Sequence, residues 1–160
     1  MKKENKRKIQ MISWVFFIIY LVMMVYFLFF NERMGRVPGS QYRYNLIPFT
    51  EIRRYLQYHQ KIGSFNVCLN LLGNVVCFIP FGFVIPILTR KQTALRMFLL
   101  SMLASVLVEL LQLVSMLGSC DVDDIILNTL GGLIGYFLFV LGRGMVRIYT
   151  KKHHQAVKRR

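Results

Sequence analysis

Seven carboxylate and amide side chains lie inside or beside long apolar segments of this 160-residue chain, where lipid alone would not tolerate them. They are Asn70, Asn74, Glu109, Gln112, Asp121, Asp124 and Asn128. Such groups can hydrogen-bond a polar ligand, hold a cation through oxygen atoms or carry a proton. A charge at the centre of a membrane helix costs at least ~2.5 kcal/mol, so these residues should pair with one another or serve a function.

The spacing of these residues places them on one face of each helix that carries them. Within a segment they are three, four or seven positions apart, which matches the repeat of an α-helix. At a rise of about 1.5 Å per residue, all of them fall in the same half of the membrane. Three polar faces at one depth predict a shared pocket that opens outward and is closed by apolar packing below.

Four apolar runs are long enough to be the helices that position these residues. Their predicted bounds are about 9–30, 65–88, 97–117 and 124–142. A spanning helix needs about 20 apolar residues, and the chain is 55% hydrophobic with a mean hydropathy of +0.45. We therefore expect an all-α, polytopic membrane protein with four transmembrane helices in a single domain, residues 1–160.

Positive charge is distributed unevenly between the two ends of the predicted helices. Of the 21 Lys and Arg residues, 15 lie in the N-terminal segment 1–8, around the turn at 89–96 and in the tail 143–160. The positive-inside rule then places both termini in the cytoplasm and residues 31–64 outside a bacterial cytoplasmic membrane. Topology and anionic lipid explain the net charge of +14, and the sequence contains no nucleic-acid motif.

The predicted outside loop contains one short amphipathic helix. Apolar residues recur at helical spacing over 52–62, and Thr50 is expected to cap this helix by accepting backbone N–H bonds. We predict that the helix lies at the membrane interface. The basic residues Arg43, Arg53 and Arg54 would either contact phosphates of lipids or lipid-linked precursors, or face solvent and lipid without a specific ligand.

Glycine residues in the fourth predicted span favour close helix contacts. Gly131, Gly132 and Gly135 include a Gly-x-x-x-Gly pair on the face that continues from Asn128. Small residues let two helix backbones approach each other in a membrane, where lipid removes the hydrophobic drive for association. This face should therefore pack against a neighbouring helix.

Four uses of the predicted pocket fit its residue types, and one of them is a proton-coupled transporter that works through Glu109. Of the other three, the first is a structural hydrogen-bond network around Glu109 that fixes helix register. The second is a binding site for a polar headgroup or a peptide, and the third is an enzyme in which Glu109, Asp121 and Asp124 hold Mg²⁺ or Ca²⁺. The sequence contains no nucleophile–base pair, phosphate loop or histidine cluster, so we predict no catalytic residue, no cofactor and no resident metal.

Three blocks of the sequence resemble the VanZ-like family of bacterial membrane proteins. The first is the loop motif formed by Asn45, Pro48 and Phe49, and the second is residues 70–82, with two asparagines and Phe-Ile-Pro-Phe-Gly. The third is residues 109–132, from a Glu-x-x-Gln pair through Asp-Val-Asp-Asp to Asn-Thr-Leu-Gly-Gly. The blocks occur in the order and spacing of the family.

This resemblance implies an envelope setting and suggests a role in resistance. The founding member of the family lowers the susceptibility of Gram-positive bacteria to the lipoglycopeptide teicoplanin. The resemblance thus implies binding or shielding at the outer face of the membrane, with membrane lipids and either a lipid-linked envelope precursor or a lipoglycopeptide as partners. The alternatives are an enzyme acting on a lipid-linked envelope molecule and a structural membrane protein without a small-molecule ligand.

Overall fold

A computed structural model of the chain describes residues 3–30, 43–58, 64–89, 92–116 and 118–158. These residues form five α-helices and two strands of two residues each. In chain order the elements are α1 (Lys3–Phe30), β1 (Tyr44–Asn45), α2 (Thr50–Gln57), α4 (Ser64–Leu88), α5 (Ala94–Ser115), β2 (Cys120–Asp121) and α6 (Val122–Lys158). The predicted all-α architecture is confirmed apart from the two short strands.

Three of these helices are long and apolar enough to cross a membrane. The apolar segments that could span are Val67–Leu88 in α4, Ala94–Ser115 in α5 and Val122–Lys151 in α6. The 30 residues of the α6 segment exceed the roughly 20 that a bilayer core requires. In α1, the apolar stretch among the described residues is Gln10–Tyr26, which is shorter than the other three. The chain is therefore a membrane protein by helix length and composition, and a fourth span through α1 stays a prediction.

The ends of α5 and α6 differ from the predicted spans for local reasons. α5 ends at Ser115 because Met116 adopts a left-handed conformation, with φ at 55°, and its N–H bonds to the carbonyl of Leu113 at 3.2 Å. α6 continues as a helix to Lys158, beyond the predicted membrane span that ends near residue 142. The tail contains no proline and is rich in Lys, Arg and other residues that tolerate a helix, so no local signal stops it.

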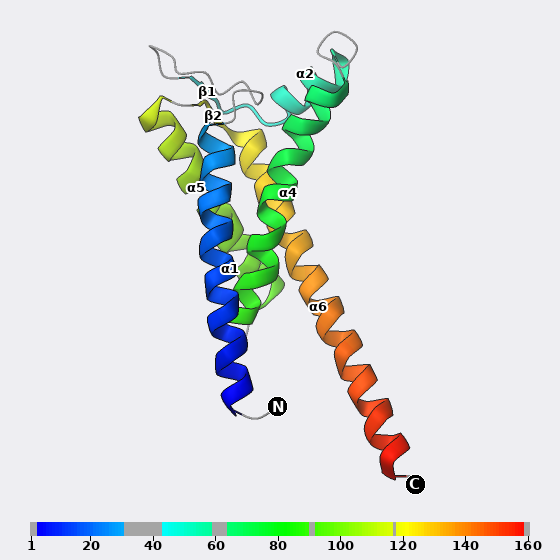
Figure 1. Ribbon diagram of the computed structural model, residues 1–160. Helices are drawn as coiled ribbons and strands as arrows, with labels where there is room; N and C mark the ends of the chain where they lie inside the picture. Colours follow the sequence, from blue (N-terminus) through cyan, green and yellow to red (C-terminus); the bar gives the residue numbers. More distant parts are fainter. Residues whose placement is uncertain (1–2, 31–42, 59–63, 90–91, 117, 159–160) are drawn as a thin grey trace.

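α6 packs along both α4 and α5, and α4 also contacts α1 (Figure 1). The glycines of α6 allow its contact with α4. A Cβ atom at Gly131 would overlap the carbonyl oxygen of Val75, and one at Gly135 would overlap that of Ile79, so α6 meets the backbone of α4 directly. The close packing predicted from the Gly-x-x-x-Gly pair is confirmed.

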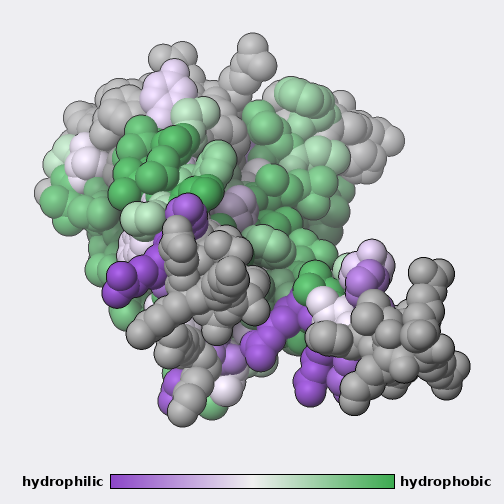
Figure 2. All heavy atoms as spheres, turned by 60° about the horizontal axis from the view of Figure 1, so that its bottom comes forward, coloured by the Kyte–Doolittle hydropathy of each residue, from purple (hydrophilic) through white to green (hydrophobic). Residues whose placement is uncertain are grey.

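The bundle has a polar interior and an apolar exterior. Among the described residues nine polar or charged side chains are buried, against seven apolar ones. The buried polar residues are Asn74, Ser101, Ser105, Glu109, Gln112, Asp121, Asp123, Asn128 and Thr129. Most of the coloured surface in Figure 2 is hydrophobic, with hydrophilic side chains gathered toward the end that carries the chain termini. This distribution suits a lipid solvent, in which polar groups must be satisfied inside the protein.

A small cap of α2, β1 and β2 lies at the end of the bundle opposite the start of α1 and the end of α6 (Figure 1). The two strands pair in parallel, with Tyr44 opposite Cys120 and Asn45 opposite Asp121. The N–H of Cys120 donates to the carbonyl of Arg43 at 3.0 Å. The pairing joins the loop before α2 to the turn before α6, and it positions the site described next.

Candidate functional site

One buried carboxylate holds α2 in place. The side chain of Asp123, in the first turn of α6, accepts hydrogen bonds from the backbone N–H groups of Phe49, Glu51 and Ile52, the last two at 2.8 and 3.1 Å. The first N–H groups of a helix have no partner within the helix and carry partial positive charge, so a carboxylate satisfies them well. Asp123 is only 1% exposed, which strengthens these charge-assisted bonds.

The start of α2 therefore differs from the sequence prediction. Thr50 was expected to cap the helix, but this expectation is wrong, because its hydroxyl donates to the carbonyl of Ile47 at 2.9 Å. The helix begins at Thr50, and the capping position is Phe49, with φ at 64° in the left-handed region. A non-glycine residue pays about 1–2 kcal/mol for this conformation, and the bond from the Phe49 N–H to Asp123 helps to hold it.

A second chain of hydrogen bonds links the loop motif to the interior. The side-chain amide of Asn45 donates to Asp121 Oδ1 at 3.1 Å, and the N–H of Asp123 donates to the same oxygen at 2.8 Å. The N–H of Asp121 in turn donates to Glu109 Oε2 at 3.0 Å. The first and third sequence blocks are thus in direct contact, and Glu109 fixes the turn that carries Asp121.

A pocket of about 290 Å³ opens above these contacts, between the cap and the upper turns of α4 and α6. Its charged lining residues are Arg43, Glu51, Arg54, Asp121, Asp123 and Asp124. Tyr44, Asn45, Ile52, Tyr55, Asn70, Leu71, Ser119 and Leu127 complete the lining. Four of the chain's seven acidic residues face this one space, although the chain as a whole carries a net charge of +14.

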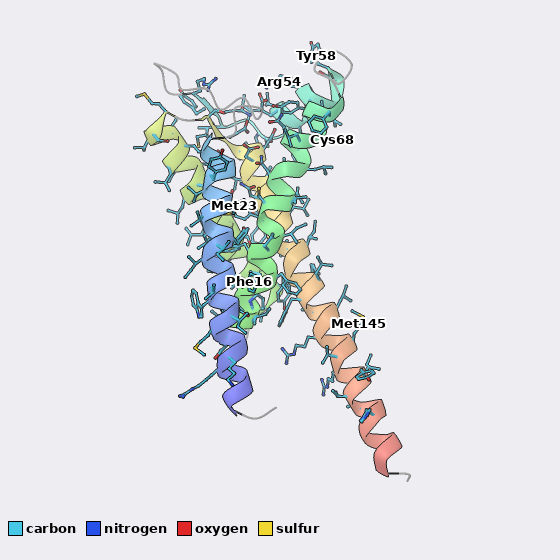
Figure 3. The ribbon with its side chains drawn as sticks, in the orientation of Figure 1. Phe16, Met23, Arg54, Tyr58, Cys68 and Met145 are labelled. Atoms are coloured by element: carbon cyan, nitrogen blue, oxygen red, sulfur yellow. The ribbon has the colours of Figure 1, made fainter. Side chains whose placement is uncertain are left out.

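Burial changes the acidity of the pocket carboxyls. Burial raises the pKa of Asp121, and the hydrogen bond from the backbone of Asp123 opposes this rise only in part. Burial also raises the pKa of Glu51, against the attraction of Arg54. Arg54 forms an ion pair with Glu51 on α2, at the cap end of the molecule in Figure 3. Burial therefore makes Asp121 and Glu51 easier to protonate than the same groups in water.

A second polar group lies below the pocket, between the helices. The amide of Asn74 on α4 donates to Asp124 on α6, and the amide of Asn128 donates to Ser105 on α5 at 2.9 Å. Glu109 is 1% exposed and Gln112 is fully buried. In the part of the chain that the structure describes, the side-chain oxygens of Asn74 and Asn128 have no hydrogen-bond partner. Both oxygens could accept bonds from internal water.

The structure divides the seven predicted site residues into these two groups. The pocket is lined by Asn70, Asp121 and Asp124, and the buried group below contains Asn74, Glu109, Gln112 and Asn128. Of the predicted phosphate contacts, Arg43 and Arg54 line the pocket and Arg53 does not. In the loop motif, Asn45 lines the pocket, whereas Pro48 and Phe49 are exposed.

Three residues of the pocket lining, Asp123, Glu51 and Tyr55, were not predicted as site residues from the sequence. Asp123 lies between the predicted site residues Asp121 and Asp124, in the first turn of α6. In the sequence alone, an acidic residue at this position is explained by its favourable interaction with the dipole of its own helix. Its partners are 71 to 74 positions away in the chain. Glu51 and Tyr55 lie on the predicted amphipathic helix, whose facing element was unknown. The rest of that predicted helix, residues 59–62, lies outside the described residues.

The chemistry of the site favours hydrogen bonding and ion pairing with a polar ligand. Among the described residues, no group of three or more His, Cys, Asp or Glu is arranged to hold a metal ion. The pocket combines two guanidinium groups with four carboxyl groups and two phenol rings. Such a lining can recognise a molecule that carries hydroxyl, amide, amino or acidic groups.

Comparison with known proteins gives one family and one curated relative. The family model described as VanZ/LLP1 matches residues 17–143 of this chain. Protein VanZ from Enterococcus faecium is 28% identical over 126 residues, which cover 77% of this chain and 70% of that protein. No solved structure matches the chain.

Proposed function

This chain belongs to the VanZ/LLP1 family, and from that premise we propose that it binds the polar part of an envelope ligand in its cap-side pocket and so lowers susceptibility to a teicoplanin-type glycopeptide. The observation that carries the proposal is the pocket itself. It gathers four of the chain's seven acidic residues, together with Arg43 and Arg54, at one end of an otherwise apolar bundle. A purely structural network needs buried pairs, but it does not need an open space lined by charge.

The proposed topology has four transmembrane helices in the cytoplasmic membrane of a Gram-positive bacterium, with both termini in the cytoplasm. α1 supports a fourth span because it packs on α4, where the Tyr20 hydroxyl donates to the carbonyl of Cys77 at 2.6 Å. The start of α1 and the end of α6 lie at one end of the bundle, and the cap lies at the other (Figure 1). The positive-inside rule then turns the pocket outward.

The cap would meet the outer membrane interface through α2. Ile52 and Tyr55 line the pocket, whereas Leu56 and Tyr58 are exposed. Exposed aromatic and aliphatic side chains on a short helix that also carries basic residues are typical of a headgroup boundary. In this position α2 would bring the pocket to the depth of lipid headgroups.

The proposed ligand has a lipid part and a polar part. The apolar exterior would hold the ligand's acyl chain in the bilayer, and the pocket would receive its peptide, sugar or phosphate groups. A lipid-linked envelope precursor and a lipoglycopeptide both have this construction. Binding of the former would shield it, and binding of the latter would divert it from its target.

The first experiment compares two neighbouring arginines of α2. A sensitive Gram-positive host would express the wild-type chain, Arg54→Gln or Arg53→Gln at equal membrane abundance, and teicoplanin susceptibility would be measured. Arg54 lines the pocket and Arg53 does not, so we expect protection from the wild type and Arg53→Gln and reduced protection from Arg54→Gln. A well-inserted wild type that gives no protection would contradict the resistance role.

One observation favours the enzyme alternative, in which the chain modifies a lipid-linked envelope molecule. Asp121 lines the pocket with a raised pKa, which is a property of general acids. An enzyme that uses Asp121 as its acid requires this carboxyl group, so Asp121→Asn should abolish its activity without changing membrane abundance. A binding protein should instead lose affinity gradually across Asp124→Asn, Asn70→Ala and Arg54→Gln.

A further inference from the structure

The C-terminal part of α6 stands apart from the bundle. We define Arg143–Lys158 as the C-terminal arm of α6, which is helical throughout. Met145 is 67% exposed and Tyr149 is 70% exposed, and Figure 3 shows Met145 on the part of α6 that has diverged from α4. In water, exposed apolar side chains on an isolated helix would be unfavourable, so this arm needs a surface to contact.

The arm has one basic face and one largely apolar face, and Lys152 falls within the sector of the apolar face. Arg143, Arg147 and Lys151 are four residues apart and form a line within an arc of about 80° on the helix. Met145, Ile148 and Tyr149 fall on the opposite side, roughly 140–240° away from Arg143. The sequence continues the basic line with His154 and Lys158. A basic amphipathic helix of this kind is typical of segments that lie on a membrane surface.

The length of α6 brings this arm to the membrane boundary. Its 37 residues give a straight helix of about 55 Å, against a hydrocarbon core of about 30 Å. About 20 residues from Val122 fill that core, so the bilayer ends near Leu141. The apolar face of the arm begins a few residues later. A helix that continued straight out of the membrane would carry this face away from lipid.

Two glycines lie where a bend in α6 would keep the apolar face of the arm in contact with lipid. Gly142 and Gly144 have open space where a Cβ atom would stand, so they serve no close packing in the structure. Glycine weakens a helix because it loses more backbone conformational entropy than other residues when the helix forms. The Thr150 hydroxyl also bonds back to the carbonyls of Val146 and Arg147, at 3.0 and 3.1 Å, a contact that bends helices.

We propose that the C-terminal arm binds the anionic lipid surface of the leaflet at the terminus end of the bundle, with α6 bending at Gly142 and Gly144. The face with Met145, Ile148 and Tyr149 enters the boundary between headgroups and acyl chains. Arg143, Arg147 and Lys151 stay at the level of the lipid phosphates, where opposite charge holds them. This interaction is independent of the pocket at the other end of the molecule.

A single fluorescent reporter tests the position of the apolar face. The chain has one tryptophan, Trp14, so Trp14→Phe removes the background and Tyr149→Trp places an indole on the arm. The full-length protein would be reconstituted in vesicles of phosphatidylglycerol mixed with brominated phosphatidylcholine, and in vesicles of brominated phosphatidylcholine alone. We expect blue-shifted emission and strong bromine quenching at position 149 in the anionic vesicles, and weaker effects without anionic lipid.

Three further variants separate lipid binding from simple proximity to the membrane. Thr150→Trp in the same background puts the indole beside the basic line, so it should be quenched less than the indole at position 149. Replacing Arg143, Arg147 and Lys151 by Gln should lower the equilibrium between bound and free arm about 100-fold, since each basic residue near an anionic surface contributes about a five-fold gain. Gly142→Ala with Gly144→Ala should stiffen the bend and reduce quenching at position 149.

Two results would overturn the proposal. One is an indole at position 149 that is red-shifted and unquenched in both vesicle types, which would leave a protein partner as the occupant of the apolar face. The other is equal quenching at positions 149 and 150, with no response to the loss of the three charges. Retained helix content and size-exclusion behaviour of each variant in detergent would show that the bundle is intact in every comparison.

Discussion

The two halves of α6 use glycine in opposite ways. In the half within the bundle, Gly131 and Gly135 lie against the backbone of α4 and leave no room for a side chain. In the half beyond it, Gly142 and Gly144 face open space. The same residue therefore fixes one half of the helix and loosens the other. The difference shows that the neighbouring helix, rather than glycine itself, decides what the residue does.

The largest expected effect comes from filling the packed half. Gly135→Ala would place a methyl group on the carbonyl oxygen of Ile79, and a rigid backbone atom cannot move aside as a flexible side chain can. We expect a loss of at least ~2 kcal/mol of stability and a lower yield of folded protein. Thermal unfolding in detergent would measure it. An unchanged midpoint would show that α4 and α6 are not in backbone contact.

At the cap end of the packed half, Asp123 holds the start of α2. Removing the Asp123 carboxylate should have the next largest effect on stability. Asp123→Ala leaves the first N–H groups of α2 without their acceptor, which should cost about 1–3 kcal/mol in the cap. We expect faster amide hydrogen exchange in α2 while α4 and α6 stay protected. Asp123→Asn keeps one acceptor oxygen, so its rate of amide exchange in α2 should lie between the rates of the wild type and of Asp123→Ala. Uniform exchange across all helices would contradict this local role.

A smaller effect is expected in the pH dependence of the protein's stability, through Asp121 beside the cap. Burial raises the pKa of Asp121 in the folded state above its unfolded value of about 3.9. The folded state thus holds the proton more tightly, so this group's stabilisation is present below about pH 4 and is lost as pH rises through the folded pKa. Thermal midpoints measured across this window should show a smaller slope in Asp121→Asn. An unchanged slope would assign the dependence to other carboxyls.

The smallest effect is expected in the free half of α6. Gly144→Ala fills open space and removes the entropic disadvantage of glycine, so it should stabilise the helix by about 0.5–1 kcal/mol. Circular dichroism of the full-length protein in detergent would show equal or slightly higher helix content. A clear loss of stability from Gly144→Ala would show that this half also has a packing partner.

Local sequence patterns predicted the elements and the faces of the helices well. The polar spacing placed Asn74 and Asn128 on faces that meet neighbouring helices, and the structure pairs them with Asp124 and Ser105. The Gly-x-x-x-Gly pair identified the close contact of α6. These successes share one cause, since the helical repeat carries information along a single element.

The pattern could not divide the predicted site into a pocket and a buried layer. Glu109 and Asp121 look alike as polar residues in apolar surroundings, yet only Asp121 lines the pocket. The difference depends on the cap, which covers the helix ends and leaves one space open. The cap depends in turn on the pairing of β1 with β2, a two-residue contact between segments about 76 positions apart that no propensity scale would find.

By itself, the sequence determined that the chain is an apolar, all-α protein whose polar residues share helix faces, and its motif blocks determined the family. Only the tertiary structure decided that Asp123 of α6 caps α2, that Asn45 meets Asp121, and that four acidic residues share one pocket. The physical reason is the distance along the chain over which each kind of interaction acts. Periodicity and hydropathy act through neighbouring residues in one helix, whereas a buried carboxylate chooses its partners among all the unsatisfied N–H groups that the fold brings within reach.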